Sequence, residues 1–288
     1  RGNEQGNTAM IKRILVLLDD TPYTSAATSY AIDLAREHQA QVTGIVAISD
    51  EAIERGAHSM GIGASYYARK LRESQEHQLD EEANRVLTEF SRACSDANVP
   101  NLDVKTHAQP LEAIIEESKY HDLLVMGLRT NSDLGGKQGQ DLLINLSREG
   151  IIPTLAVSSR HRPIEHVLYL YDGSVQAARS IQMYVTSGIF KSTSGTILTL
   201  SDDESEESDT AEEFNSDMAV YLDSHGRHCR RKIDAAMRKD EILDFAAEIE
   251  ADLIVMGAYG KSKIMQFFLG SLTKTLIRSS TINLYLYH

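Results

Sequence analysis

The feature that most constrains the fold of this chain is an internal repeat. The string DLLVMG at residues 122–127 returns as DLIVMG at residues 252–257, 130 residues later. At the same offset, IIPTLAV at 151–157 lies over TINLYLY at 281–287. Two stretches that match without a gap over this distance indicate a duplicated domain. The chain therefore has two halves that end alike.

The two halves also begin alike. RILVLLDDT from Arg13 matches HVLYLYDGS from His166, which places Asp19 over Asp172 at an offset of 153 residues. The first half is thus the longer one, and the polar segment RHRP at 160–163 is the expected linker. We predict a disordered end or tag remnant at 1–9, a first domain at 10–160 and a second domain at 161–288.

Short apolar runs alternate with helical patterns in both halves. In the first half the runs at 14–18, 42–48, 99–106, 123–126 and 154–157 are typical of buried strands. The intervening segments repeat apolar residues at helical spacing. Continuous apolar strands separated by helices indicate a parallel sheet that is covered on both faces. The predicted fold class is therefore α/β, with two tandem doubly wound domains.

Composition excludes several classes of protein. The formal net charge of −13 opposes binding to nucleic acid or to anionic lipid. No apolar run reaches the roughly 18 residues that a membrane-spanning helix needs. The two cysteines, Cys94 and Cys229, lack the spacing of a zinc site or a disulfide framework, and they fit a reducing cytoplasm.

Two segments lie outside the simple alternation. Residues 59–96 predict an irregular loop followed by a long polar helix that buries Leu79, Ala83, Val86, Leu87 and Phe90. The acidic segment Ser201 to Asp209 is interpreted as a solvated mobile loop, with a regulatory or cation-attracting role as the alternative.

Glycines after the last DLIVMG string are the candidate site. A Walker phosphate loop that ends at Gly260-Lys261-Ser262 would need glycine at position 255, which is Val255. Counted from Gly257 instead, the glycines follow the spacing G-x2-G-x9-G-S through Gly260 to Gly270-Ser271. The first two would let backbone approach a ligand at a strand end, and the last pair would open a helix whose free N–H groups attract phosphate. Turn glycines and an ordinary N-cap serine remain the simpler interpretation.

With this spacing in place, the sequence resembles a tandem universal stress protein over nearly its whole length. The stretch DLIVMGAYGKSKIMQFFLGSLTKT at 252–275 carries the ATP-binding glycine pattern of that family complete. The resemblance implies an adenine-nucleotide hydrolase-like, Rossmann-like domain in each half, with five parallel strands between helices. It also implies that the last strands of the two halves pair as an intramolecular pseudo-dimer. Whether chains form a homodimer stays open.

The resemblance assigns roles to particular residues. Asp172 would meet the nucleoside, Leu200 would offer backbone to the adenine, and the glycines with Ser271 would wrap the phosphates and ribose. A helix N-cap is the competing role for Asp172. The predicted nucleotide-binding residues are Asp172, Leu200, Met256, Gly257, Gly260, Lys261, Gly270, Ser271, Leu272 and Thr273.

The first half departs from this pattern. At the 130-residue offset Gly127 is retained, whereas Thr130, Gln140 and Asp141 replace Gly260, Gly270 and Ser271. A carboxylate at the helix start would repel phosphate, so we expect one nucleotide per chain, in the second half.

The sequence predicts binding more strongly than catalysis. It contains no recognisable pair of nucleophile and base, and it suggests no catalytic residue and no metal ligand. We expect a cytoplasmic ATP-binding regulatory protein of the stress response, with ATP bound with or without Mg²⁺ and an unknown protein partner. The alternatives are an interaction scaffold with a vestigial site and a slow ATPase.

Overall fold

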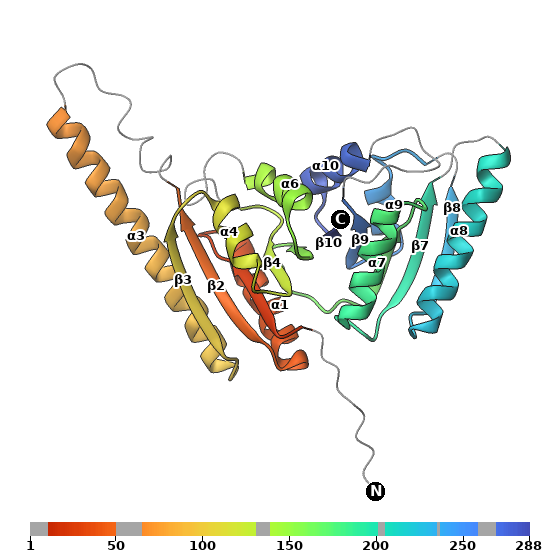
Figure 1. The fold of residues 1–288 in the computed structure, drawn as a ribbon, viewed down its shortest axis with the longest axis horizontal. Helices are drawn as coiled ribbons and strands as arrows, with labels where there is room; N and C mark the ends of the chain where they lie inside the picture. Colours follow the sequence, from red (N-terminus) through yellow and green to blue (C-terminus); the bar gives the residue numbers. More distant parts are fainter. Residues whose placement is uncertain (1–10, 50–64, 131–138, 201–204, 235–236, 259–268) are drawn as a thin grey trace, which may run out of the picture.

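A computed structural model describes residues 11–49, 65–130, 139–200, 205–234, 237–258 and 269–288 (Figure 1). The strands of the first half are β1 (Arg13–Leu17), β2 (Gln41–Ile48), β3 (Asn101–His107), β4 (Leu123–Gly127) and β5 (Thr154–Val157). Those of the second half are β6 (His166–Leu170), β7 (Ser194–Leu200), β8 (Cys229–Asp234), β9 (Leu253–Gly257) and β10 (Asn283–Tyr287).

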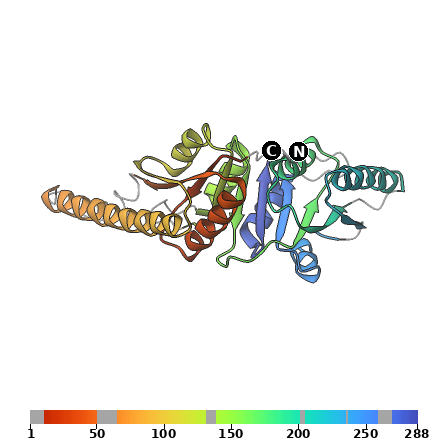
Figure 2. The ribbon, with the colours of Figure 1, turned by 90° about the horizontal axis from the view of Figure 1, so that it is seen from below.

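Helices alternate with these strands. The first half contains α1 (Pro22–His38), α3 (Ser65–Asp96), α4 (Pro110–Ser118) and α6 (Gly139–Glu149). The second half contains α7 (Val175–Ser187), α8 (Ser205–Ser224), α9 (Ile242–Glu248) and α10 (Leu269–Ser279). The predicted α/β class and the tandem arrangement are confirmed. The longest helices, α3 and α8, lie at opposite ends of the molecule (Figures 1 and 2).

All the strands join in one ten-stranded sheet of order β3-β2-β1-β4-β5-β10-β9-β6-β7-β8. Within each half neighbouring strands are parallel, in the order 3-2-1-4-5 of a doubly wound domain. The halves meet where β5 pairs antiparallel with β10, with Leu155 opposite Tyr285. The expected pairing of the last strands is therefore confirmed, and it leaves neither of them as an open edge.

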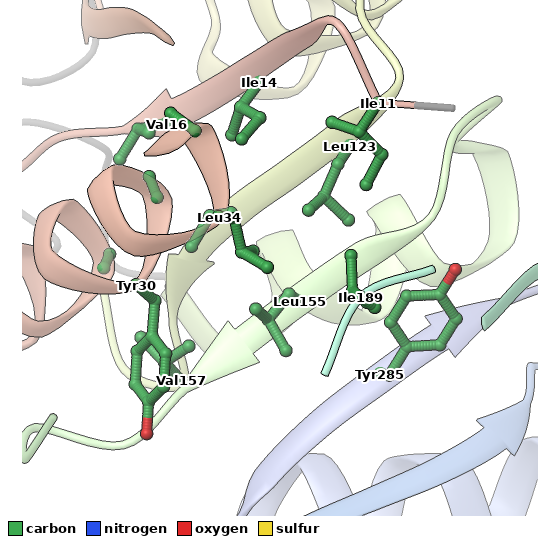
Figure 3. Close-up of a cluster of buried hydrophobic side chains, with 14 of the residues drawn as sticks. Ile11, Ile14, Val16, Tyr30, Leu34, Leu123, Leu155, Val157, Ile189 and Tyr285 are labelled. Atoms are coloured by element: carbon green, nitrogen blue, oxygen red, sulfur yellow. The ribbon is translucent and has the colours of Figure 1, made fainter. Parts of the chain in front are cut away.

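Each face of the sheet carries one apolar core that runs through both halves. The core on one face includes side chains of α1, α3, α7 and α8, and the core on the other includes those of α4, α6, α9 and α10. Figure 3 shows the first core at the junction, where Leu155 of β5 lies near Ile189 and Tyr285 of β10 and Val157 of β5 lies beside Tyr30 of α1. The duplicated halves thus share their hydrophobic cores across the junction.

The two irregular segments have different outcomes. The predicted apolar stripe of α3 is confirmed, since Ala83, Val86, Leu87 and Phe90 are buried and Leu79 is partly buried against the same core. The loop interpretation of Ser201 to Asp209 is wrong from Ser205 onward, where α8 begins, and residues 201–204 lie outside the described residues. The acidic residues at 205–209 belong to the first turns of a helix, where negative charge interacts favourably with the helix dipole.

Candidate functional site

The candidate site lies at the carboxyl ends of β6 and β9. These two strands are parallel neighbours, with Leu170 opposite Met256. The helix after β6, α7, packs on one face of the sheet, and the helix after β9, α10, packs on the other. Such a reversal of winding opens a crevice beyond the strand ends, which is where doubly wound domains bind their ligands. The fold therefore brings Asp172, two residues after β6, to the same edge as Gly257.

Asp172 presents an unusual carboxylate. Its Oδ1 accepts a hydrogen bond from the backbone N–H of Ser174 at 3.0 Å. Its Oδ2 is enclosed and has no hydrogen-bond partner among the residues that the structure describes. A buried carboxylate oxygen without a hydrogen-bond donor destabilises the folded protein. We therefore expect a ligand or a water molecule to donate a hydrogen bond to this oxygen.

The suggested N-cap role of Asp172 is wrong. The cap of α7 is Ser174, whose hydroxyl oxygen accepts a hydrogen bond from the N–H of Ala177 at 3.1 Å. Asp172 instead fixes the turn before the cap, and Gly173 in that turn has φ +73° with Phe214 where a side chain would point. Because Ser174 caps the start of α7, Oδ2 of Asp172 is not used to cap this helix.

The matching aspartate of the first half is satisfied by its own surroundings. Oδ1 of Asp19 accepts hydrogen bonds from the hydroxyls of Thr21 and Thr24, each at 2.6 Å, and from the N–H of Thr21 at 3.2 Å. At the 153-residue offset, Ser174 and Ala177 stand at the places of these threonines. The serine hydroxyl is used as a cap and the alanine has none, so Asp172 lacks the two hydroxyl donors that Oδ1 of Asp19 has.

Gly257 has a packing role that the sequence reasoning missed. A Cβ atom there would lie 2.5 Å from the backbone nitrogen of Ala177 and 2.6 Å from the carbonyl carbon of Gln176. Gly127 of the first half is constrained in the same way, since its Cβ would lie 2.5 Å from the Cβ of Tyr23 in α1. The first glycine of the pattern thus lets a helix approach the strand end, and this explains why both halves keep it.

The second part of the glycine pattern is placed in α10. Gly270, Ser271, Leu272 and Thr273 lie in the first two turns of this helix, whose first backbone N–H groups point away from the helix toward the strand ends as in other helix starts. Ser271 is exposed, Leu272 is partly buried and Thr273 is buried. Gly260 and Lys261 lie outside the described residues, so their predicted roles stay predictions.

Two further residues of the predicted set lie at strand ends. Leu200 is the last residue of β7, the neighbour of β6, and its side chain is buried in the core on the α10 side of the sheet. The side chain of Met256 is buried in the same core, and its carbonyl oxygen accepts a hydrogen bond from the hydroxyl of Ser180 at 2.8 Å. The backbone of these residues, not their side chains, is what they can offer a ligand.

Sequence reasoning also missed Lys239. It lies in the connection between β8 and α9, and its Nζ donates a hydrogen bond to Oγ of Ser271 at 2.8 Å. Burial lowers the pKa of Lys239 below its ordinary value of 10.5. The signal available in the sequence was a longer connection, because seven residues (235–241) separate β8 from α9 whereas two (108–109) separate β3 from α4.

The equivalent helix start of the first half is occupied by an interdomain contact. Asp141 lies in the first turn of α6, and its Oδ1 is 3.8 Å from the guanidinium of Arg278 in the last turn of α10. The carboxylate is stabilised there both by the helix dipole and by a cation from the other half. Gln140 precedes it in the helix, and Thr130 follows β4 where the second half has Gly260.

No group of three or more His, Cys, Asp or Glu residues in the described ranges is arranged to hold a metal ion. Within those same ranges, no helix has the length and apolar character needed to cross a membrane.

Comparison with known proteins gives consistent matches. The sequence model of the Universal stress protein family matches residues 10–139 and again 163–288. Universal stress protein Slr1230 of Synechocystis is 21% identical over 285 residues, which cover 94% of this chain and 98% of the relative. The crystal structure of a universal stress protein from Archaeoglobus fulgidus has a TM-score of 0.66 at 19% identity and covers 95% of both chains. A functionally unknown protein from Pseudomonas aeruginosa has a TM-score of 0.58 at 10% identity, over 96% of this chain and 92% of its own.

Proposed function

This chain belongs to the universal stress protein family, and from that premise we propose that it is an ATP-binding regulatory protein of the stress response. One nucleotide binds per chain, in the second half, beyond the carboxyl ends of β6 and β9. The single observation that carries this proposal is the enclosed, unpartnered Oδ2 of Asp172.

The carboxylate of Asp172 suits a nucleoside better than a phosphate. An ionised carboxylate only accepts hydrogen bonds, and the ribose hydroxyls of a nucleotide donate them. In Rossmann-like sites an acidic residue near a strand end commonly binds these hydroxyls. A ribose hydroxyl at Oδ2 would satisfy the one carboxylate oxygen for which the described residues offer no donor.

The opposite part of the site suits the phosphates. The first turn of α10 presents backbone N–H groups, the hydroxyl of Ser271 and the positive end of the helix dipole. Leu200, at the end of the next strand, offers backbone on the other side of Asp172, where the adenine would lie. The first half lacks both features, because Asp19 is already hydrogen bonded and Asp141 places a negative charge at the helix start.

The proposed activity is binding, and its consequence is regulatory. Occupancy of the site would change the affinity for a protein partner only if the partner distinguishes the bound from the free state. A scaffold whose site is vestigial would bind no nucleotide, and a slow ATPase would bind ATP and release phosphate.

Titration calorimetry of the purified full chain with ATP tests the proposal. We expect saturation at one nucleotide per chain, and we expect Asp172→Asn to weaken binding by roughly tenfold or more. The matched control is Asp19→Asn, the same substitution at the equivalent place in the first half, which should leave the affinity within about twofold.

Two outcomes of this titration and one of a phosphate-release assay distinguish the candidate functions. Absence of saturable binding in the wild type would favour the scaffold. Equal losses in the Asp172 and Asp19 variants would argue against the assigned site. Phosphate release by the wild type that is abolished in Ser271→Asp, which copies the acid of the first half, would favour the ATPase.

A further inference from the structure

Lys239 lies in the connection after β8, and its side chain reaches the start of α10. It follows β8, the edge strand, and its Nζ donates to Oγ of Ser271 over 2.8 Å. The hydroxyl of Ser271 is thus held between an ammonium group and the first turn of the helix. An anion bound at this helix start would meet the ammonium, the hydroxyl and the backbone N–H groups together.

The carboxylates beside Lys239 are held by a different cation. The guanidinium of Arg238 contacts Asp240 at 2.8 Å and Glu241 at 3.6 Å, and the backbone N–H of Arg238 donates to Glu241 at 2.8 Å. Lys239 donates a hydrogen bond to Ser271. Partial burial of Lys239 disfavours its charged form and lowers its pKa. A negatively charged ligand in contact with the ammonium group would stabilise the charged form.

The first half has no counterpart of this lysine. Its connection between β3 and α4 consists of Ala108 and Gln109 alone. The second half has the complete glycine pattern. It also has the longer connection before α9, which places Lys239 at the start of α10. The half that lost the pattern has Asp141 at the equivalent helix start, paired with Arg278.

We propose that Lys239 binds the terminal phosphates of the nucleotide and so makes the site selective for nucleotides over nucleosides. This inference rests on the proposed function, because it adds a phosphate-binding residue to the same site. The ammonium acts as a point charge on phosphate oxygens, as lysines do in other phosphate sites. Ser271 then turns its hydroxyl proton to the phosphate while Lys239 stays within reach of both.

The test is titration calorimetry of the full chain with ATP and with adenosine, in the wild type and three variants. Lys239→Met removes the charge and keeps the length of the side chain, and Lys239→Arg keeps the charge. Arg238→Gln is the matched control, because it removes one positive charge from the neighbouring position of the same turn. Thermal unfolding of each variant checks that it folds.

We expect Lys239→Met to weaken ATP binding by roughly tenfold or more and adenosine binding by less than about twofold. Lys239→Arg should recover most of the ATP affinity, and Arg238→Gln should change it by less than about threefold. The affinity of the wild type for ATP should also fall more steeply with added salt than that of Lys239→Met.

Two results would overturn the inference while the proposed function stands. One is an unchanged ATP affinity in Lys239→Met. The other is an equal loss for ATP and adenosine, which would give Lys239 a merely structural role. Failure of the wild type to bind either compound is a different result, and it would overturn the proposed function together with this inference.

Discussion

Arg129 of the first half donates a hydrogen bond through its guanidinium to the carbonyl oxygen of Ile277 in the second half at 2.8 Å. The same group donates to the carbonyl oxygens of Arg278 at 2.8 Å and Ser280 at 3.1 Å. These carbonyls lie at and just beyond the end of α10, where a helix leaves its acceptors unpaired. One arginine therefore caps the helix whose other end is the proposed phosphate site.

This arginine lies in the segment of the first half that corresponds to the start of the glycine pattern. It is the second residue after Gly127, between this glycine and Thr130. Together with the contact of Asp141 to Arg278, it attaches the first half to α10 of the second half. The residues that replace the glycine pattern thus lie beside contacts across the junction.

Replacement of Arg129 should loosen this attachment. We expect Arg129→Ala to lower the free energy of unfolding by about 2–3 kcal/mol, because several carbonyl oxygens lose a charged donor. Arg129→Lys should recover less than half of that, since an ammonium cannot reproduce the planar fork. Urea denaturation measures both, with Arg72→Ala on the exposed part of α3 as the control. An effect of Arg129→Ala no larger than the control would contradict the capping role.

Asn283 should matter as much as any apolar residue at the junction. Its Oδ1 accepts from the N–H of Ser158 at 2.8 Å, and its Nδ2 donates to the carbonyl of Asp252 at 2.8 Å and to the hydroxyl of Tyr30 at 3.2 Å. The hydroxyl of Tyr30 donates in turn to the carbonyl of Arg162 in the linker at 2.8 Å. One amide thus joins β10, β9, α1 and the segment after β5.

Asn283→Ala should lower the free energy of unfolding by about 2–3 kcal/mol, because it removes the partner of a partly buried N–H, of a partly buried carbonyl and of the Tyr30 hydroxyl. Tyr30→Phe should cost less, about 1 kcal/mol, since the ring still packs in the core. Chemical denaturation followed by circular dichroism provides the values, and Asn84→Ala on the exposed face of α3 provides the baseline. Matching losses for Asn283→Ala and Asn84→Ala would disprove the bridging role.

The repeat predicts most of the fold from the sequence. Continuous apolar strands and helical spacing predicted the elements of each half, and the family resemblance predicted that β5 and β10 meet. The loop interpretation of 205–209 was wrong because it considered the charge of these residues without their position, although carboxylates are favourable in the first turns of a helix.

The site was only partly predictable for a different reason. The sequence shows that Ala177 stands where the first half has Thr24, which donates to Oδ1 of Asp19, but only the structure shows that Oδ2 of Asp172 is enclosed without a donor among the described residues. Contacts such as Lys239 with Ser271, or Arg129 with Ile277, join positions that no local pattern relates. Periodicity identifies elements, whereas contacts between loops depend on how those elements pack.

Substitution of Gly257 can distinguish two roles of this glycine: close packing of α7, and close approach of a ligand to the backbone. A Cβ there meets only backbone atoms of α7, which cannot move aside as a side chain would. Gly257→Ala should therefore lower the free energy of unfolding by about 1–3 kcal/mol even without nucleotide, through displacement of α7. Gly127→Ala should have a similar effect through α1 in the half that is not expected to bind ATP. If Gly257→Ala left the stability of the nucleotide-free protein unchanged, its role would lie in ligand approach instead.

The stability of the protein should fall in mild acid, partly because of His121. This side chain is buried between α4 and β2, with Nδ1 2.7 Å from the carbonyl oxygen of Glu117 and Nε2 2.9 Å from the hydroxyl of Thr43. A neutral ring that donates through Nδ1 and accepts at Nε2 satisfies both partners. Burial lowers the pKa of His121 below its ordinary 6.5, and the charge of Arg13 acts in the same direction.

The sign of the effect follows from this pKa. Below about pH 6.5 the unfolded chain binds a proton at this histidine more readily than the folded protein does. Its contribution to stability is therefore complete above pH 6.5 and is lost as the pH falls toward the lower pKa of the folded state. Urea denaturation at pH 8 and pH 5 compares the wild type with His121→Gln, which cannot titrate. The variant should be less stable at pH 8, where it has lost the packing and hydrogen bonds of the neutral ring, and this difference should shrink at pH 5. Parallel pH curves for the two proteins would show that His121 does not cause the loss of stability in acid.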